Sequence, residues 1–252
     1  MIINVARKEL KSMFASPMGW VILSVLIFAF ATYFINAVTQ YYGIMSGSIK
    51  TNGRIGVTMF IGQSVFGLAS FVMLFAVPLL SMRLISEERR SQTLTFLLSA
   101  PISLTEIVLG KFLGLVTFLT IIIVLITAML LTLSNWTELD YGFIFSNVLG
   151  LWLLIASFSA LGLYFSSITA QPAIAGLLSF IALFALLALD QFVAADSNNP
   201  LSQILRQLSL MNHFEPLSQG IIDSTNICFF LLFTATFLIL TLRRLEAERL
   251  RA

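Results

Sequence analysis

Long apolar runs separated by short polar stretches dominate the chain. Six of these runs reach the length of about 20 residues that an α-helix needs to cross the hydrocarbon core of a bilayer. The pattern therefore predicts an all-α integral membrane protein with six transmembrane helices in one domain over residues 1–252. The predicted spans are residues 18–38, 57–82, 112–133, 143–165, 173–193 and 225–242.

The residues before the first span have a different, amphipathic pattern. Basic residues lie among apolar ones at helical spacing, which predicts a helix in the membrane interface over residues 1–16. Basic residues before an apolar run also suit a secretory signal peptide, with a possible cleavage motif at residues 29–31. Because apolar residues continue to Val38, we prefer the interfacial helix followed by a span.

Lysine and arginine are distributed unevenly between the two ends of the predicted spans. An even number of spans places both termini on one side, and that side carries all but three of the 14 Lys and Arg residues. The exceptions are Lys50, Arg54 and Arg206. Because short cytoplasmic loops are enriched in Lys and Arg, we expect both termini and the polar stretch 83–111 in the cytoplasm.

The composition excludes several classes of function. Hydrophobic residues make up 58% of the chain and charged residues 10%, whereas a soluble domain carries roughly 25% charged residues. The central parts of the predicted spans lack Asp, Glu, Lys, Arg and His, which disfavours an ion-coupled carrier. With one histidine, His213, and one cysteine, Cys228, the chain cannot build a His or Cys metal cage.

No nucleotide-binding motif is evident either. The nearest approach to a phosphate-binding loop, residues 105–112, has Thr105 in place of the first glycine and Phe112 in place of the final Ser or Thr. We therefore expect no catalytic, cofactor-binding or metal-binding residues in this chain. Any ATP-driven work requires another polypeptide.

The polar stretch 83–111 is the densest charged segment of the chain. Its pattern predicts an extension of the second span, a short apolar stripe, a stop at Pro101, and a capping box at Ser103-x-x-Glu106 that starts the next helix. Two interpretations stay open. The stretch is either a well-capped reversal resting on lipid headgroups or a rigid knob on which a soluble partner docks.

Two further patterns concern packing. Small residues at four-residue spacing, Gly110 with Gly114 and Ala156 with Ala160, favour close helix contacts within the chain or between subunits. Between the fifth and sixth spans an amphipathic stripe predicts a short outer helical segment. The stripe consists of Leu201, Ile204, Leu205 and Leu208.

Several segments resemble one membrane protein family. Residues 88–103, ERRSQTLTFLLSAPIS, followed by Glu106-x-x-x-Gly110-Lys111, look like the cytoplasmic signature of ABC-2-type export permeases, the membrane subunits of ATP-binding-cassette transporters. Arg7-Lys8-Glu9-Leu10 with Phe14-x-Ser16-Pro17 is similar to the family's elbow helix. Residues 212–215 and 220–223 are similar to the branch that serves gliding motility and nitrous oxide reductase maturation.

The resemblance implies a half-transporter in a bacterial inner membrane. It would pair with a second permease, identical or related, above two P-loop ATPase subunits that bind the ATP, with no nucleic acid involved. A coupling helix between the second and third spans would contact the ATPase through Glu87, Glu88, Arg89, Arg90, Thr93, Leu94, Leu97, Leu98 and Pro101. The elbow helix residues would be Arg7, Lys8, Glu9 and Phe14. The alternative is a membrane scaffold or immunity-type protein that binds a partner without transport.

Overall fold

The computed structural model describes residues 1–46, 56–93, 103–193 and 207–249. Within these ranges the chain is helical and contains no strand, which confirms the all-α prediction. The helices are α1 (Ile2–Ala15), α2 (Pro17–Met45), α3 (Val57–Ser81), α4 (Ser86–Arg90), α6 (Leu104–Leu131), the 3-10 helix η1 (Thr132–Asn135), α7 (Tyr141–Ile168), α8 (Pro172–Val193), α10 (Leu210–Ser218) and α11 (Ser224–Arg249).

Each predicted span coincides with one long apolar helix. Among the described helices, five have the length and composition to cross a membrane, and α8 is apolar over the shorter stretch Pro172–Ala188. Helix α6 begins at Leu104, eight residues before the predicted span 112–133. The reason is the capping box: the Ser103 hydroxyl accepts a hydrogen bond from the Glu106 N–H, and the Glu106 carboxylate accepts one from the Ser103 N–H.

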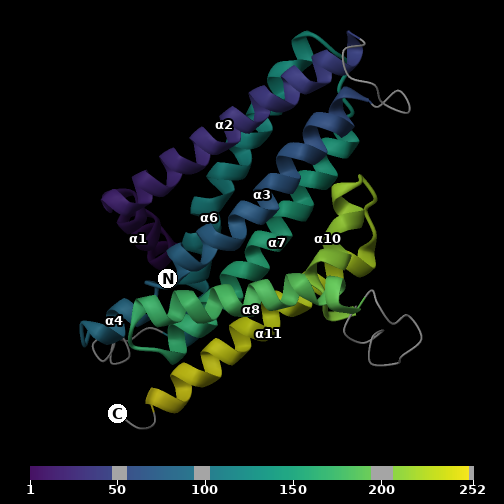
Figure 1. Ribbon diagram of the computed structural model, residues 1–252. Coiled ribbons are helices and arrows are strands. Elements are labelled where there is room, and N and C mark those ends of the chain that lie inside the picture. Colours follow the sequence, from purple (N-terminus) through teal and green to yellow (C-terminus); the bar gives the residue numbers. More distant parts are fainter. Residues whose placement is uncertain (47–55, 94–102, 194–206, 250–252) are drawn as a thin grey trace.

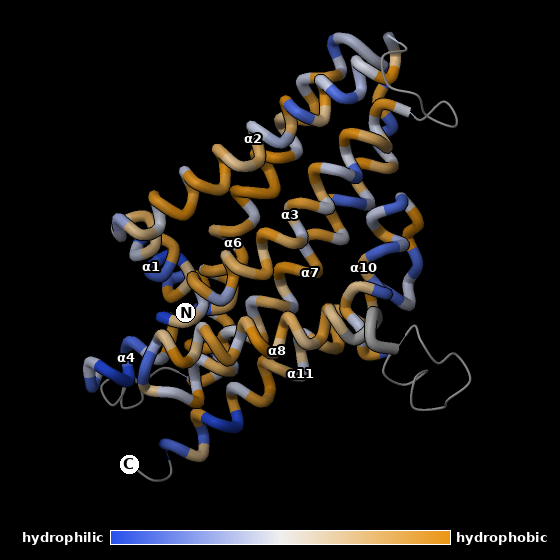
Figure 2. Tube along the Cα trace, in the orientation of Figure 1, coloured by the Kyte–Doolittle hydropathy of each residue, from blue (hydrophilic) through white to orange (hydrophobic). Residues whose placement is uncertain are grey.

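Helix α7 is the centre of the bundle, and α2 and α11 are at its periphery (Figure 1). The apolar part of α7 is 72% buried, whereas the corresponding parts of α2 and α11 are only 22% and 17% buried. The 18-residue apolar parts of both peripheral helices are strongly apolar, whereas the C-terminal end of α11 is hydrophilic (Figure 2). A helix that is apolar on all sides but exposed suits contact with lipid or with another membrane subunit.

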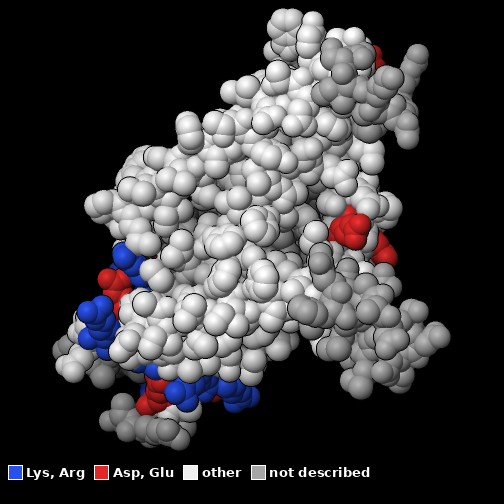
Figure 3. All heavy atoms as spheres, viewed as in Figure 1, with Lys and Arg blue, Asp and Glu red and all other residues white. Residues whose placement is uncertain are grey.

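Lysine and arginine side chains gather at one end of the bundle. On the face in Figure 3 they lie with carboxylates around α1, α4 and the end of α11, whereas only carboxylates are seen near α10. The opposite end is marked by α10, which packs on α7: the Ser146 hydroxyl donates a hydrogen bond to the Leu217 carbonyl at 2.8 Å, and Phe214 is buried. Of the predicted outer stripe, residues 201, 204 and 205 lie outside the described residues, and Leu208 is exposed.

Candidate functional site

The break between α3 and α4 is held by a serine of the central helix. The Ser166 hydroxyl accepts hydrogen bonds from the backbone N–H groups of Ile85 and Ser86, both at 3.1 Å, and donates one to the Met82 carbonyl at 3.0 Å. Ser166 is fully buried. It therefore satisfies backbone groups that the end of one helix and the start of the next leave unpaired. This positions the short helix α4 against the end of α7.

Lys111 joins three segments at the charged end of the bundle. Its ammonium donates hydrogen bonds to Glu9 Oε1 of α1 at 2.9 Å, to Glu88 Oε1 of α4 at 2.7 Å, and to the Leu84 carbonyl at 2.7 Å. A lysine has three N–H donors, so each one points to a different segment. Only 2% of the Lys111 side chain is exposed. The cluster contains two carboxylates for one cation, and Glu88 Oε2 has no hydrogen-bond partner within the described chain.

Two glycines bring α1 close enough for Glu9 to reach Lys111. A Cβ atom on Gly110 would lie 2.6 Å from Val5 Cβ, and one on Gly114 would lie 2.8 Å from Glu9 Cβ. Only glycine permits these contacts at the observed helix separation. The predicted packing role of the Gly110 and Gly114 pair is therefore confirmed as a contact within the chain, between α1 and α6. On the same side Phe14 packs against Phe118 of α6, with ring centroids 5.1 Å apart.

Arg89 ties α4 to two other helices. Its guanidinium donates to the carbonyls of Ser167 and Ile168 at the end of α7, the latter at 3.0 Å. It also donates to both carboxylate oxygens of Glu248 near the end of α11, at 2.5 and 2.7 Å. Carboxylate contacts of this kind are among the stronger side-chain interactions. Together, Lys111 and Arg89 connect α4 to α1, α6, α7 and α11.

The structure separates the predicted coupling residues into two groups. Glu88 and Arg89 are engaged in contacts within the chain, whereas Glu87, Arg90 and Thr93 are exposed. Residues 94, 97, 98 and 101 of the predicted set lie outside the described residues. In the elbow helix Glu9 is buried, and Arg7 and Lys8 are exposed.

Three residues of this site were given no role from the sequence: Lys111, which was quoted only as part of the family signature, and Ser166 and Glu248, which were not singled out. A signal for Lys111 was present, since the capping box starts α6 at Leu104 and places this charge two turns inside an apolar helix. Such a position requires a partner for the charge. Ser166 and Glu248 gave no comparable signal.

The comparison with protein families covers nearly the whole chain. A family model described as "ABC-2 family transporter protein" matches residues 3–250. It specifies no branch of the family. The comparison with curated proteins gives no match.

Proposed function

The chain belongs to the ABC-2 family of transporter proteins, and from this premise we propose that it couples ATP hydrolysis by a separate subunit to the export of a substrate. It is a multi-pass membrane permease, with several helices able to cross a bilayer. The ATP site is on the partner, since residues 105–112 lack two positions that a phosphate-binding loop needs. Spans without central ionisable residues favour an external energy source over an ion gradient.

The Lys111 cluster is the observation that carries this proposal. A partner that moves α4 also moves Glu88, and the buried ammonium transmits this to α1 and α6. Arg89 transmits the same movement to the ends of α7 and α11. Solvent and salt screen buried ion contacts less than exposed ones, so these side chains attract one another more strongly. A soluble ATPase acting on α4 would therefore act on four further helices.

The exposed residues beside this cluster are the proposed contacts for the ATPase. Glu87, Arg90 and Thr93 face outward on or directly after α4. Arg7 and Lys8 are exposed on α1 and would form a second contact. Glu88 and Arg89 act inside the permease in this scheme, passing on movement instead of touching the partner.

The proposed assembly contains two ATPase subunits beneath two permeases, the second being identical or related, with the substrate path along the permease interface. We place it in a bacterial inner membrane with both termini in the cytoplasm. The gathering of lysine and arginine at the end of the bundle that holds α1, α4 and the end of α11 supports this orientation. The contacts of α4 with both α1 and Glu248 support an even number of spans, since they bring the two ends of the chain together.

Purification of the tagged protein from its host membrane tests the proposal. We expect a subunit with a P-loop to co-purify, and the complex to hydrolyse ATP. Glu87→Lys reverses an exposed charge on α4 and should weaken ATPase binding about tenfold. Glu246→Lys is the matched control, since this carboxylate is 48% exposed on α11 and should leave binding unchanged.

Purification without a P-loop subunit and without ATP hydrolysis would contradict the proposal and favour the scaffold alternative. Equal effects of Glu87→Lys and Glu246→Lys would instead exclude α4 as the contact. Reversing Glu88 and Arg89 is a poor test, because both have partners within the chain and their loss would disturb the fold.

A further inference from the structure

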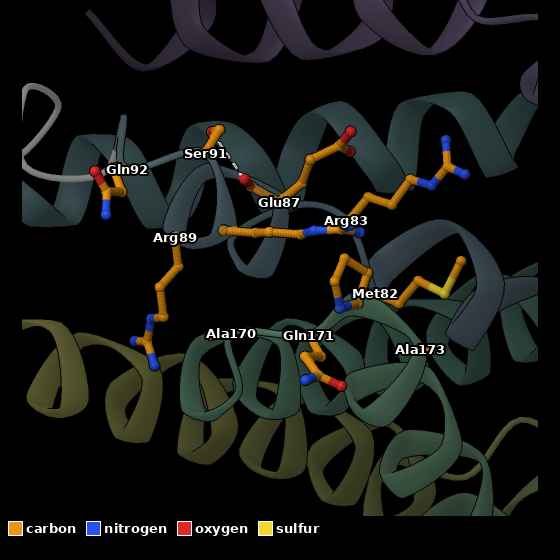
Figure 4. Close-up of a pocket in the computed structure, with 11 residues that line it drawn as sticks. Met82, Arg83, Glu87, Arg89, Ser91, Gln92, Ala170, Gln171 and Ala173 are labelled. Carbon is orange, nitrogen blue, oxygen red and sulfur yellow. Dashed lines mark hydrogen bonds between the residues drawn. The ribbon is translucent and has the colours of Figure 1, made fainter.

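A cavity of about 1080 Å³ opens at the charged end of the bundle, between α4 and the turn that leads into α8 (Figure 4). Its size is comparable to the largest ligand pockets, which reach roughly 1,000 Å³. Arg83, Arg89 and Arg90 line it together with a single carboxylate, Glu87. Gln171 lies on the opposite wall, across from Arg83.

The cavity has an excess of positive charge that the described chain does not neutralise. Arg89 is paired with Glu248 and extends toward α11, away from the Arg83 side (Figure 4). The side chains of Arg83 and Arg90 form no ion pair or hydrogen bond within the described residues. Glu87 offsets one of these two charges, which leaves the cavity with a surplus of one positive charge. A singly charged anion would balance it.

Apolar surface begins directly at the rim of the cavity. Ala173 lines the cavity at the start of α8, and from there the exposed side chains of Ile174, Leu177 and Ile181 continue along the helix, with 44%, 59% and 53% of each exposed. On the α3 side the wall is formed by Met82, the residue that follows this helix. A ligand seated here would place its charged group among arginines and its remainder against hydrocarbon side chains.

We propose that this cavity binds the phosphate of an anionic phospholipid such as phosphatidylglycerol, with the acyl chains along the exposed face of α8. A phosphodiester carries one negative charge, which matches the surplus. Basic pockets between membrane helices are known to hold anionic lipid headgroups. The bound lipid would bridge α4 and the start of α8. The cavity shares Glu87 and Arg90 with the proposed ATPase contact, but lipid binding requires only that the permease is embedded in a membrane, so it is tested on the permease alone.

Native mass spectrometry of the purified permease tests the site without any ATPase. Phosphatidylglycerol is titrated against phosphatidylcholine of equal chain length, and we expect preferential retention of phosphatidylglycerol. The double variant Arg83→Gln with Arg90→Gln should lower its affinity about twenty-five-fold, since each cation near an anionic headgroup contributes about fivefold. The control Arg243→Gln with Arg249→Gln removes two exposed arginines from α11 and should change the affinity less than twofold.

A second variant keeps the test valid if the glutamine variant does not fold. Ala173→Glu places a carboxylate on the exposed cavity wall and leaves the arginines in place. We expect it to abolish the preference for phosphatidylglycerol. Helical circular dichroism and size-exclusion chromatography check the fold of each variant. The double variant Arg83→Lys with Arg90→Lys, which keeps both charges, should retain the preference.

Three results would overturn the proposal. An equal loss of phosphatidylglycerol affinity in the α11 control would show that the lipid binds through general attraction to basic residues on the protein surface. Equally strong competition by glycerophosphoglycerol, the same phosphodiester headgroup without acyl chains, would show that the cavity takes a soluble anion. Unchanged lipid binding in the double variant Arg83→Gln with Arg90→Gln would show that these arginines do not hold a lipid headgroup.

Discussion

Replacing Lys111 by methionine removes a buried cation while keeping a side chain of similar length. Glu88 then has no counter-charge, Glu9 keeps only the exposed Lys8 at 3.9 Å, and the Leu84 carbonyl loses its donor. Breaking a buried ion pair by removing one partner destabilises a protein by about 3–5 kcal/mol. The two carboxylates are 12% and 20% exposed, so water partly solvates them. We therefore expect a loss near the lower limit, about 3 kcal/mol.

Thermal unfolding of the detergent-solubilised protein, followed by helical circular dichroism, measures this loss. For a chain of this length about 1 kcal/mol corresponds to a shift of about 2–4 °C, so Lys111→Met should lower the melting temperature by about 6–12 °C. Lys8→Met is the matched control. Lys8 lies 3.9 Å from the same Glu9 oxygen but is 68% exposed. Its loss should be below about 1 kcal/mol.

A triple variant separates the charge imbalance from the loss of packing. Glu9→Gln and Glu88→Gln, combined with Lys111→Met, leave three neutral side chains of nearly unchanged volume. Replacing a whole buried ion cluster by neutral groups is often close to neutral in stability. The triple variant should therefore recover most of the loss. A Lys111→Met protein that melts within about 2 °C of the wild type, or a triple variant no better than Lys111→Met, would refute the buried ion cluster.

Three further changes test the contacts that position α4 and α1, each by thermal unfolding. Gly110→Ala should destabilise the protein by about 1–3 kcal/mol, because the added Cβ overlaps α1. Ser166→Ala should remove about 1–3 kcal/mol, since two buried N–H groups lose their acceptor. Arg89→Met should remove about 1–3 kcal/mol and speed tryptic cleavage near the end of α11, because the carboxylate held there is released.

Matched substitutions provide the controls for these three changes. A Cβ on Gly67 of α3 meets nothing within 4 Å, so Gly67→Ala should stabilise by about 1 kcal/mol through helix propensity. Ser179→Ala removes a buried hydroxyl that bonds only to a carbonyl of its own helix, and Arg243→Met breaks an ion pair that is 78% and 48% exposed. Both should cost less than about 1 kcal/mol. A control that lowers the melting temperature as much as its test variant would contradict the contact assigned to that variant.

The sequence predicted the helices well because their signals are local. An apolar run of spanning length identifies its own helix, and the Ser103 capping box defines the start of α6 through residues three positions apart. The pairing of Lys111 is different in kind. Its partners Glu9 and Glu88 lie 102 and 23 positions away, so no local pattern connects them. The sequence therefore places Lys111 in the family signature without indicating which residues pair with it.

The orientation of α4 could not be predicted for a related reason. Successive residues of an α-helix are about 100° apart, so Glu87, Glu88, Arg89 and Arg90 point in four directions. Glu88 faces α6 and α1, Arg89 faces α7 and α11, and the outer two are exposed. Which direction faces the bundle depends on helices that are distant in the sequence. A helix of five residues has too few positions to show an apolar face of its own.

The shortness of α4 also determines how it can act. An isolated helix below about 12 residues is marginal in water, so α4 owes its position to the side chains that hold it. Lys111 belongs to α6 and Ser166 to α7, and Arg89 of α4 itself reaches the ends of α7 and α11. A partner that moves the exposed face of α4 therefore acts directly on these contacts. Substitution of Glu87 or Arg90 should therefore change partner binding without changing the melting temperature, whereas substitution of Glu88 or Arg89 should change both.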